Sequence, residues 1–328
     1  MLFVLALLTL GAGGWSAVAG LWTAGDPLWV LSLVAGGLVL STFISGTVSG
    51  DYSWVDRLWS TAPIGFAWYY AWRAMAESAA WLPMGVAAAL VTLWGARLTF
   101  NFARRGGYSH YEDYRWPILR ARIKPKIFWH LFSLLFISAY QIGLFLLFTL
   151  PLYGLYLHST AGQVASGLSL WLAALLGLAF LVYETLADQQ RWDFHRVKAA
   201  LRAGGDAAAV DVQAPRYARW VADVATGYPT AGLFRYSRRP NYFGELGFWW
   251  AIYGVGIAAA GLAVHWSLLG PVMLSLLFVG STKFTDAITA SRYPTYGVYM
   301  RQTSAIVPWW RKAAAASSPT APARSQSQ

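Results

Sequence analysis

The 328-residue sequence contains no cysteine, and this absence excludes several kinds of site. The chain cannot form a disulfide, hold an iron–sulfur cluster or zinc through thiolates, or use a cysteine nucleophile. Its five histidines show no H-x-x-x-H or other spacing typical of metal ligands. The sequence therefore predicts no metal site.

Sequence motifs typical of soluble enzymes are also missing. Gly254-Val-Gly256 with Gly261 does not match G-x-G-x-x-G and follows no predicted strand, so these glycines are predicted to pack helices together. The sequence has no phosphate-binding P-loop and no G-x-S-x-G nucleophile elbow. If the chain binds a nucleotide, it does so outside these common frameworks.

Charged residues are scarce at 12%, about half of what soluble globular proteins contain. Hydrophobic residues make up 57%, and the mean hydropathy is +0.43. The 19 tryptophans and 18 tyrosines suit a chain whose amphipathic rings lie at two membrane interfaces. This composition predicts an all-α, polytopic membrane helical bundle.

Apolar runs of about membrane length predict the transmembrane helices. The first apolar run, at residues 1–22, lacks the basic start of a secretory signal peptide, so it is interpreted as a transmembrane span. The run at 61–76 is short, so a re-entrant segment and seven spans in total is the alternative to eight. The eight predicted spans cover 1–22, 28–48, 61–76, 82–102, 127–149, 165–187, 244–263 and 266–283.

The net charge of +11 is unevenly distributed: 21 of the 25 lysines and arginines fall in 103–126, 188–243 and 284–328. Each pair of these segments is separated by two spans, and the connections 150–164 and 261–266 carry no Lys or Arg. This is the positive-inside pattern of a multi-pass membrane protein, with the basic loops and the C-terminus cytoplasmic. It argues against binding to nucleic acid.

The domain organisation is predicted to be simple. Residues 1–312 form a single membrane-embedded domain that begins with two N-terminal spans in 1–48. The Gly/Ala/Asp-rich part of the 188–243 segment, 203–214, is predicted to be a mobile surface loop. The low-complexity tail 313–328 is predicted to be disordered.

Six ionisable side chains at membrane depth are the main candidates for function, because burying charge in a membrane is costly. Glu184 and Asp188 are four residues apart, so they share one helical face, and Lys283 and Asp286 are three apart. All six are predicted to line one polar chamber; the alternative is that they only pair with one another. They are Arg97, Glu184, Asp188, Glu245, Lys283 and Asp286.

The stretch from Gly232 to Glu245 concentrates cationic and aromatic groups at the start of a span. Asn241 is predicted to cap the following helix and to share a face with Glu245. The cluster indicates a docking site for a polar ligand; the alternative is a positive-inside flank with a helix cap. Its members are Arg235, Tyr236, Arg238, Arg239 and Tyr242.

The motif Gly232-Leu-Phe-Arg-Tyr-Ser-Arg-Arg-Pro-Asn-Tyr-Phe-Gly-Glu245 resembles the C-terminal signature of the steroid 5α-reductase-like superfamily, in particular its bacterial branch. The resemblance covers residues 50–310 and implies an integral protein of the bacterial inner membrane. Supporting matches are Asp56-Arg-Leu-Trp-Ser60, Leu93-Trp-Gly-Ala-Arg97, Arg104-Arg105, Tyr183-Glu-Thr-Leu-Ala-Asp-Gln189 and Tyr299-Met-Arg-Gln-Thr-Ser-Ala-Ile-Val-Pro-Trp309.

This resemblance implies bound NADPH beside a lipid pocket. Asn241 and Glu245 match residues that contact the cofactor, and Glu184 and Asp188 match a polar pair that lines its site. A guanidinium suits a phosphate, so the resemblance assigns the phosphates to Arg105, Arg238 and Arg239, with a further contact from Lys283. The predicted cofactor-binding set is completed by Arg97, Arg191, Tyr236, Tyr242 and Asp286.

The substrate half departs from the steroid reductases. Trp94 stands where those enzymes have a tyrosine that polarises the substrate carbonyl, and an indole N–H cannot deliver a proton in that way. By elimination, Asp56 or Tyr69 is the predicted acid. The predicted reaction is NADPH-dependent hydride transfer to a double bond of a lipid-like substrate (steroid, isoprenoid or fatty).

Two other functions remain open. Membrane methyltransferases hold S-adenosylmethionine with a related Arg-x-Pro-x-Tyr-x-Gly element, matched here from Arg238 to Gly244. A non-catalytic lipid-binding protein of the same fold would keep the helices without turnover. The expected partners are membrane lipids and a lipid-like substrate; the sequence carries no signal for the oligomeric state.

Overall fold

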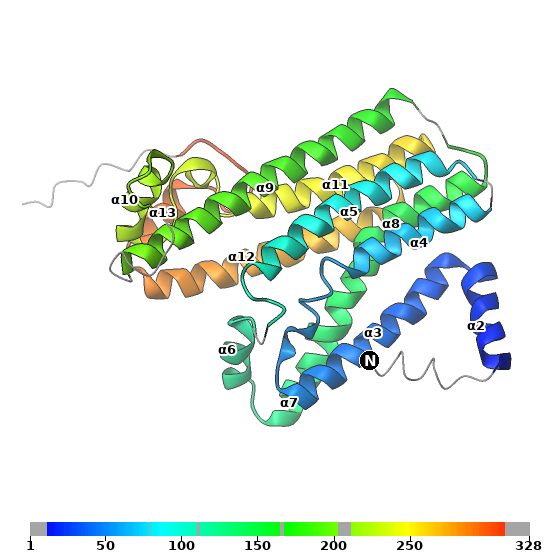
Figure 1. The fold of residues 1–328 in the computed structure, drawn as a ribbon, viewed down its shortest axis with the longest axis horizontal. Coiled ribbons are helices and arrows are strands. Elements are labelled where there is room, and N and C mark those ends of the chain that lie inside the picture. Colours follow the sequence, from blue (N-terminus) through cyan, green and yellow to red (C-terminus); the bar gives the residue numbers. More distant parts are fainter. Residues whose placement is uncertain (1–11, 78, 110–111, 165–166, 203–210, 312–328) are drawn as a thin grey trace, which may run out of the picture. The chain divides into compact units, whose positions relative to one another are not determined.

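The computed structural model describes residues 12–77, 79–109, 112–164, 167–202 and 211–311 (Figure 1). These residues form helices and turns, and the described chain contains no β-strand beyond an isolated bridge between Ser237 and Ser304. The predicted all-helical fold is confirmed. The predicted loop 203–214 and tail 313–328 lie largely or wholly outside the described residues.

The chain divides into two compact units, which are described separately. The first comprises Met1–Asp188 and Gly244–Gly280, and the second comprises Gln189–Phe243 and Ser281–Gln328. The prediction of a single domain stays a prediction. Three helices contain the points of division: α9 (Leu168–Arg202), α11 (Pro240–Ala260) and α12 (Leu269–Arg292).

The remaining elements of the first unit lie mostly in the N-terminal half of the chain. They are α2 (Ala12–Ala24), α3 (Pro27–Ser49), η1 (Tyr52–Trp54), α4 (Ala62–Ala76), α5 (Trp81–Ala103), α6 (Arg115–Arg122), α7 (Lys126–Phe132), η2 (Ser133–Tyr140), α8 (Gln141–Thr160) and η5 (Trp266–Leu268).

Local sequence explains where α3 begins and ends. The Asp26 carboxylate accepts a hydrogen bond from the Trp29 backbone N–H at 3.0 Å, and Pro27 occupies the first helical position. Gly50 ends the helix with a φ of 71°, a left-handed conformation that glycine adopts without steric cost. Gly25 and Asp26 form the short connection between α2 and α3.

Within the described residues, six helices are long and apolar enough to cross a membrane: Pro27–Ser49, Trp81–Ala103, Lys126–Thr160, Leu168–Arg202, Pro240–Ala260 and Trp266–Arg292. They correspond to six of the eight predicted spans. The predicted span 1–22 lies partly outside the described residues. The helix of the 61–76 segment, α4, has only 15 residues. At about 1.5 Å per residue it is shorter than a hydrocarbon core of about 30 Å.

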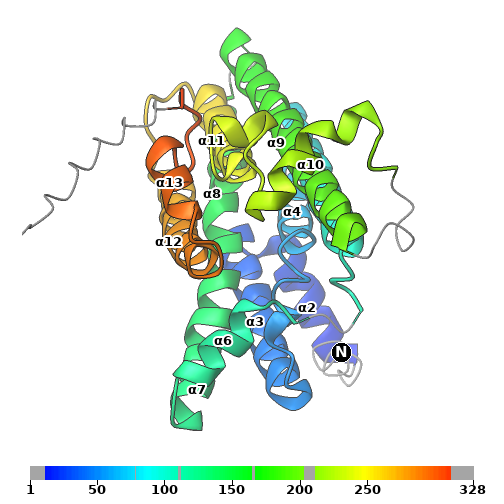
Figure 2. The ribbon, with the colours of Figure 1, turned by 90° about the vertical axis from the view of Figure 1, so that its left-hand side faces the viewer.

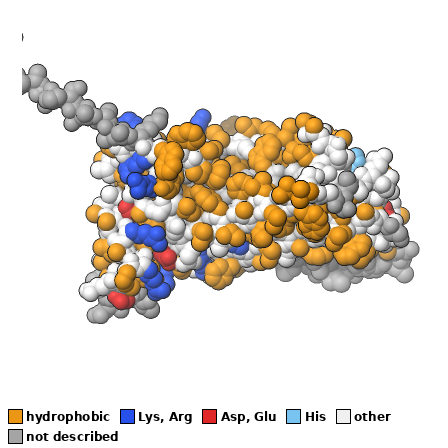
Figure 3. Space-filling view, turned by 90° about the horizontal axis from the view of Figure 1, so that it is seen from above, with side chains coloured by type: hydrophobic (Ala, Val, Ile, Leu, Met, Phe, Trp, Pro, Cys, Tyr) orange, Lys and Arg blue, Asp and Glu red, His pale blue; other side chains and the backbone are white. Residues whose placement is uncertain are grey.

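The first unit is built around α4, α5 and α8, which pack against one another, while α3 packs against α8 and η2 (Figure 1). Large side chains fill the interior, including Tyr70, Met84, Phe145 and Phe148, each with no measurable exposure. Outward-facing side chains on the spans are also apolar, and hydrophobic groups cover most of the surface seen in Figure 3. Both features are expected of helices surrounded by lipid.

Helices α7, η2 and α8 form one continuous helical rod from Lys126 to Thr160 (Figure 2). The sequence predicted that this span would end at residue 149. The helix continues past Pro151 because residues 150–156 are all buried and extend the packed surface. The connection predicted at 150–164 is therefore mostly helical.

Close approach of α9 and α11 depends on glycine. A Cβ atom on Gly244 would lie 2.5 Å from the Cβ of Glu184, and one on Gly247 would lie 2.2 Å from a ring carbon of Phe180. Neither position tolerates a larger side chain without a shift of a helix. The absence of side chains at both positions lets α11 place Glu245 beside Glu184.

The second unit contains η3 (Pro215–Tyr217), α10 (Ala218–Thr226), η4 (Gly232–Arg235) and α13 (Tyr296–Gln302). One small core consists of Phe194, Val197, Tyr217, Trp220 and Phe234. A second groups three tyrosine rings, Tyr228, Tyr296 and Tyr299.

The predicted helix cap at Asn241 is wrong. Helix α11 begins at Pro240, so Asn241 is the second helical residue. Proline is favoured at the first helical position, because its fixed φ suits the helix and its missing N–H would have no partner there. The Oδ1 atom of Asn241 is buried and accepts no hydrogen bond from any described residue.

Candidate functional site

Four charged side chains from three helices meet in the first unit. The Arg97 guanidinium, on α5, is paired through Nη1 with Glu184 Oε1 at 2.7 Å and Asp188 Oδ2 at 2.6 Å, both on α9. Its Nη2 lies 3.3 Å from Oε2 of Glu245 on α11. None of the four side chains is more than 8% exposed. We call this group the Arg97 cluster.

Three neutral groups orient the carboxylates of the Arg97 cluster. The indole N–H groups of Trp94 and Trp249 donate to Glu245 Oε2 and Oε1 at 3.0 and 3.1 Å. The Asn101 amide donates to Asp188 Oδ2 at 2.8 Å. Glu184 Oε2, by contrast, is buried and has no hydrogen-bond partner among the described residues. A proton shared with Glu245 or a hydrogen-bond donor on a ligand would satisfy this oxygen.

The Arg97 cluster contains three carboxyl groups and one guanidinium, so its fully ionised form carries an excess of two negative charges. Uncompensated charge in a low-dielectric interior is costly. Protons can remove the imbalance, and so can a ligand that carries positive charge. The cluster therefore has the electrostatic character of a ligand site as well as that of a structural ion pair.

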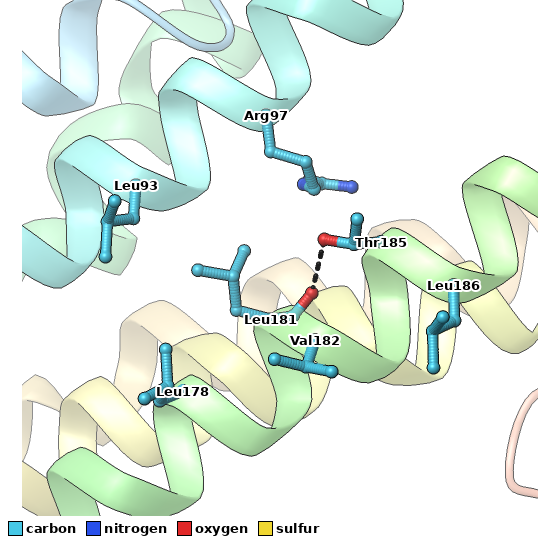
Figure 4. A pocket seen from close by; sticks show the side chains of 7 residues that line it. All are labelled: Leu93, Arg97, Leu178, Leu181, Val182, Thr185 and Leu186. Atoms are coloured by element: carbon cyan, nitrogen blue, oxygen red, sulfur yellow. Dashed lines mark hydrogen bonds between the residues drawn. The ribbon is translucent and has the colours of Figure 1, made fainter.

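An apolar groove of about 350 Å³ lies against the Arg97 cluster, between α5 and α9. In Figure 4, Arg97 extends from α5 towards α9, where Thr185 donates to the Leu181 carbonyl at 2.7 Å. The rest of the lining is aliphatic: Leu93, Leu178, Leu181, Val182 and Leu186. Leu93, Val182 and Leu186 are each 53% exposed on the outer surface of their spans. A hydrocarbon chain could reach Arg97 along this groove from the surrounding lipid.

The second unit has its own charged cluster around Asp286. Its Oδ2 accepts hydrogen bonds from Arg238 Nε and Nη2 at 3.2 and 2.7 Å, and its Oδ1 accepts from Arg239 and the Tyr296 hydroxyl at 3.2 and 2.7 Å. Arg238 Nη1 also donates to the backbone carbonyls of Met300 and Thr303. All three guanidinium nitrogens of Arg238 thus bind groups of the protein.

The predicted cofactor-binding residues fall into distinct environments. Arg97, Glu184, Asp188 and Glu245 form one cluster, and Arg238, Arg239 and Asp286 form another; the prediction of one chamber containing six ionisable groups stays a prediction. Lys283 and Arg105 are exposed, whereas Arg191, Tyr236, Asn241 and Tyr242 are half-buried. The Tyr242 hydroxyl lies 3.4 Å from Ser281 Oγ, and the ring of Tyr236 packs edge-on against Trp310.

The three candidate catalytic residues have separate hydrogen-bond partners. Trp94 is fully buried and bound to Glu245. The Tyr69 hydroxyl donates to the Trp22 carbonyl at 2.8 Å and accepts from Arg73. The Asp56 carboxylate accepts from the Trp116 indole at 3.1 Å. None of the three lines the groove of Figure 4.

Asp56 lies between α3 and α4, outside the spans, in a polar surrounding that also contains Ser53, Asp113 and Arg115. Burial raises the pKa of its carboxyl from 3.8 to about 6, although Arg115 opposes the increase. Asp56 is therefore the predicted acid whose titration lies nearest to neutral pH.

Replacing Asp56 by asparagine is expected to stabilise the protein above pH 6. A raised carboxyl pKa means that the folded state loses stability as pH rises from about 4 through about 6. The difference between 3.8 and about 6 corresponds to about 3 kcal/mol as an upper value. Melting temperatures in detergent at pH 4 and pH 7.5 measure the effect; a gain for D56N at both pH values would contradict this prediction. The exposed Asp211→Asn variant is the control.

Sequence reasoning missed Asn101 and Trp249, which complete the Arg97 cluster. Both are neutral, so the search for ionisable groups in apolar spans did not find them. A usable signal was present: Asn101 follows Arg97 by four residues, and Trp249 follows Glu245 by four. On a helix this spacing places each beside a charged residue that had been predicted.

Comparison with known proteins shows the family of this chain but does not indicate an activity. Residues 42–303 match the family described as "Protein of unknown function (DUF1295)". The uncharacterized protein C594.04c of Schizosaccharomyces pombe is 32% identical over 280 residues, covering 83% of this chain and 78% of that protein. No solved structure matches the chain. The match to the family model spans most of the membrane helices and both charged clusters, and the chain belongs to the DUF1295 family.

Proposed function

We propose that this protein is a membrane reductase that uses NADPH to reduce a double bond in a lipid-like substrate. The observation that carries the proposal is the Arg97 cluster with the apolar groove beside it. Ionisable groups within membrane spans are costly and therefore mark functional sites by default. The resemblance of residues 232–245 to the steroid 5α-reductase-like superfamily supports the choice of cofactor.

The groove suits the apolar part of such a substrate. Its volume of about 350 Å³ is within the range of small-molecule pockets, which is roughly 300–1,000 Å³. Its leucine and valine lining would hold a hydrocarbon and exclude water, while Arg97 is the only charged group in the lining. A substrate that is apolar along its length and polar at one end fits this arrangement.

Each of the two units, taken by itself, offers groups of a kind that NADPH needs. Glu184 Oε2 in the first unit and Asn241 Oδ1 in the second are buried acceptors without a partner among the described residues. Each could accept a hydrogen bond from an amide or ribose hydroxyl. Lys283 is an exposed cation that could meet a phosphate, and Arg238 is already bound to Asp286 and two carbonyls. Arg105, also exposed, stays a candidate from the sequence resemblance.

When bound, NADPH supplies a hydride, and its nicotinamide ring becomes positively charged. In its fully ionised form, the Arg97 cluster would favour a ligand that develops positive charge. The groove would orient the double bond and keep water from it. Addition of hydride to one carbon requires a proton at the other; the sequence predicts Asp56 as its source, but this residue does not line the groove.

Binding of the cofactor is the first test. We expect NADPH to raise the melting temperature of the detergent-solubilised protein, because a ligand at 100 times its Kd stabilises by about 2.7 kcal/mol. The shift should be at least halved in Glu184→Gln, which keeps the shape of the side chain, and unchanged in the control Ser169→Ala, an exposed position on the same helix outside the groove. Oxidation of NADPH in the presence of a membrane lipid extract then tests turnover. Absence of a shift at millimolar NADPH would overturn the proposal.

A second candidate function rests on the charge of the Arg97 cluster. Two uncompensated carboxylates suit S-adenosylmethionine, whose sulfonium is a cation, and Arg238 to Gly244 match the Arg-x-Pro-x-Tyr-x-Gly element of membrane methyltransferases. The same melting assay with S-adenosylmethionine separates the two functions. Stabilisation by S-adenosylmethionine alone would identify a methyltransferase, and binding of lipid with neither cofactor would identify a lipid-binding protein.

A further inference from the structure

A second pocket of about 590 Å³ lies in the first unit, where the rod formed by α7, η2 and α8 begins. It shares no lining residue with the groove beside Arg97. Cationic and aromatic side chains dominate its lining: Tyr52, Arg120, Lys124, Lys126, Trp129 and His130. We call it the Trp129 pocket.

The Trp129 pocket carries net positive charge. Arg120 is paired with Glu112 at 3.0 Å and also donates to the Gly50 carbonyl at 2.9 Å. Lys124 and Lys126 are exposed, and neither forms an ion pair or hydrogen bond with another described residue. After the Arg120–Glu112 pair is counted as neutral, two lysine charges remain to attract an anion.

Aromatic groups form a rigid wall of the Trp129 pocket. The rings of Tyr52 and Trp129 meet edge to face with centroids 4.9 Å apart, and the Arg120 guanidinium lies 5.5 and 5.9 Å from their centroids. Trp129 is only 4% exposed. Its indole nitrogen and His130 Nδ1 are both buried without a hydrogen-bond partner among the described residues.

Buried donors in native proteins are nearly always hydrogen-bonded, so an indole N–H that has no partner among the described residues and lies beside a cationic pocket favours a bound ligand as its partner. Phosphate oxygens accept hydrogen bonds and carry negative charge. A phosphate group would therefore accept the hydrogen bond of the Trp129 indole and also balance the charge of the two lysines.

The surface next to the Trp129 pocket indicates where the phosphate comes from. Ile127, Phe128, Leu131 and Leu135 follow Lys126 directly, and each is between 49% and 68% exposed. They begin the apolar span Lys126–Thr160. Basic and aromatic side chains at the end of a span lie at the level of lipid headgroups, and the neighbouring apolar side chains face the acyl chains.

We propose that the Trp129 pocket binds the phosphate of an anionic membrane lipid, whose acyl chains would lie against Ile127 and the exposed residues after it. Lys124 and Lys126 attract the headgroup, and the Trp129 indole donates to a phosphate oxygen. The site is separate from the Arg97 cluster and does not depend on the proposed reductase function.

Lipid binding to the purified full-length protein tests this inference. The protein in detergent is titrated with phosphatidylglycerol, with phosphatidylcholine and with inorganic phosphate, and bound lipid is counted by native mass spectrometry. We expect phosphatidylglycerol to bind at least tenfold more tightly than phosphatidylcholine. Lys124→Gln/Lys126→Gln should remove that preference, and Trp129→Phe, which keeps a ring but loses the donor, should weaken phosphatidylglycerol binding about tenfold.

Arg122→Gln/Arg235→Gln is the matched control, because it also removes two exposed positive charges but neither residue lines the pocket. Its lipid preference should equal that of the unmodified protein. An equal loss in the control would show diffuse charge attraction and overturn the inference. Displacement of phosphatidylglycerol by millimolar inorganic phosphate would show that the pocket takes a soluble anion, which would overturn a lipid source. Unaltered binding in the lysine double variant would also overturn it.

Discussion

Replacement of Arg97 by methionine is expected to destabilise the folded protein by about 3–5 kcal/mol, the usual cost of removing one partner from a buried ion pair. Arg97 forms ion pairs with Glu184, Asp188 and Glu245, and no side chain in this cluster is more than 8% exposed. Methionine preserves the length and apolar stem of the side chain, so the loss of charge dominates the effect. A lower melting temperature and faster inactivation in detergent would show it.

The matched control for this prediction is Arg105→Met, which removes the same group from an exposed position on the turn after α5. It should change the melting temperature little, because exposed charges contribute about 0–1 kcal/mol. A second variant isolates the electrostatic cause: adding Glu184→Gln and Glu245→Gln to Arg97→Met should recover part of the lost stability. Equal stability of Arg97→Met and the unmodified protein would show that the cluster is not electrostatically coupled.

The pairing within the Arg97 cluster could be predicted from sequence because charges in apolar spans have few alternatives to one another. Arg97, Glu184 and Asp188 stand out by contrast with the leucines and alanines around them. Trp249 and Asn101 do not stand out, since tryptophan is abundant in this chain and asparagine is neutral. Their roles depend on which face of each helix turns inward, and that is decided by packing between distant segments.

Helix ends were less predictable than helix positions. Apolarity indicates which residues lie in lipid, but a helix continues wherever its residues still pack, as α8 does to Thr160 and α9 to Arg202. At the start of α11 two local preferences competed, because Asn241 suits a cap and Pro240 suits the first helical position. The proline prevailed, and Asn241 became a half-buried side chain whose buried Oδ1 has no hydrogen-bond partner among the described residues.

Arg238 belongs to a motif that is compatible with two roles, phosphate binding and structural pairing. The resemblance to reductases implies a phosphate contact, and that role stays a prediction. The structure shows Arg238 bound to Asp286 and to the carbonyls of Met300 and Thr303, while its own backbone N–H donates to the Ser304 carbonyl at 2.8 Å. These contacts connect the segment before α11 to α12 and to the end of α13.

Arg238→Ala is therefore expected to lower the stability of the protein by about 3 kcal/mol without any cofactor present. The variant removes four hydrogen bonds from a guanidinium whose side chain is only 9% exposed, and it leaves Asp286 with Arg239 as its remaining cationic partner. Arg238→Lys should recover little of the loss, because an ammonium cannot reproduce the planar arrangement of donors. Thermal unfolding of the cofactor-free protein in detergent measures both effects.

Arg235→Ala provides the control, since Arg235 belongs to the same motif but is exposed. Its melting temperature should match that of the unmodified protein. The outcome distinguishes the two possible roles of Arg238. If Arg238 binds the phosphate of NADPH, cofactor-free Arg238→Ala should be as stable as the unmodified protein and lose only the shift in melting temperature caused by NADPH. If Arg238 is structural, its replacement should lower the melting temperature of the cofactor-free protein, and any loss of NADPH binding would follow from the displacement of α12 and α13.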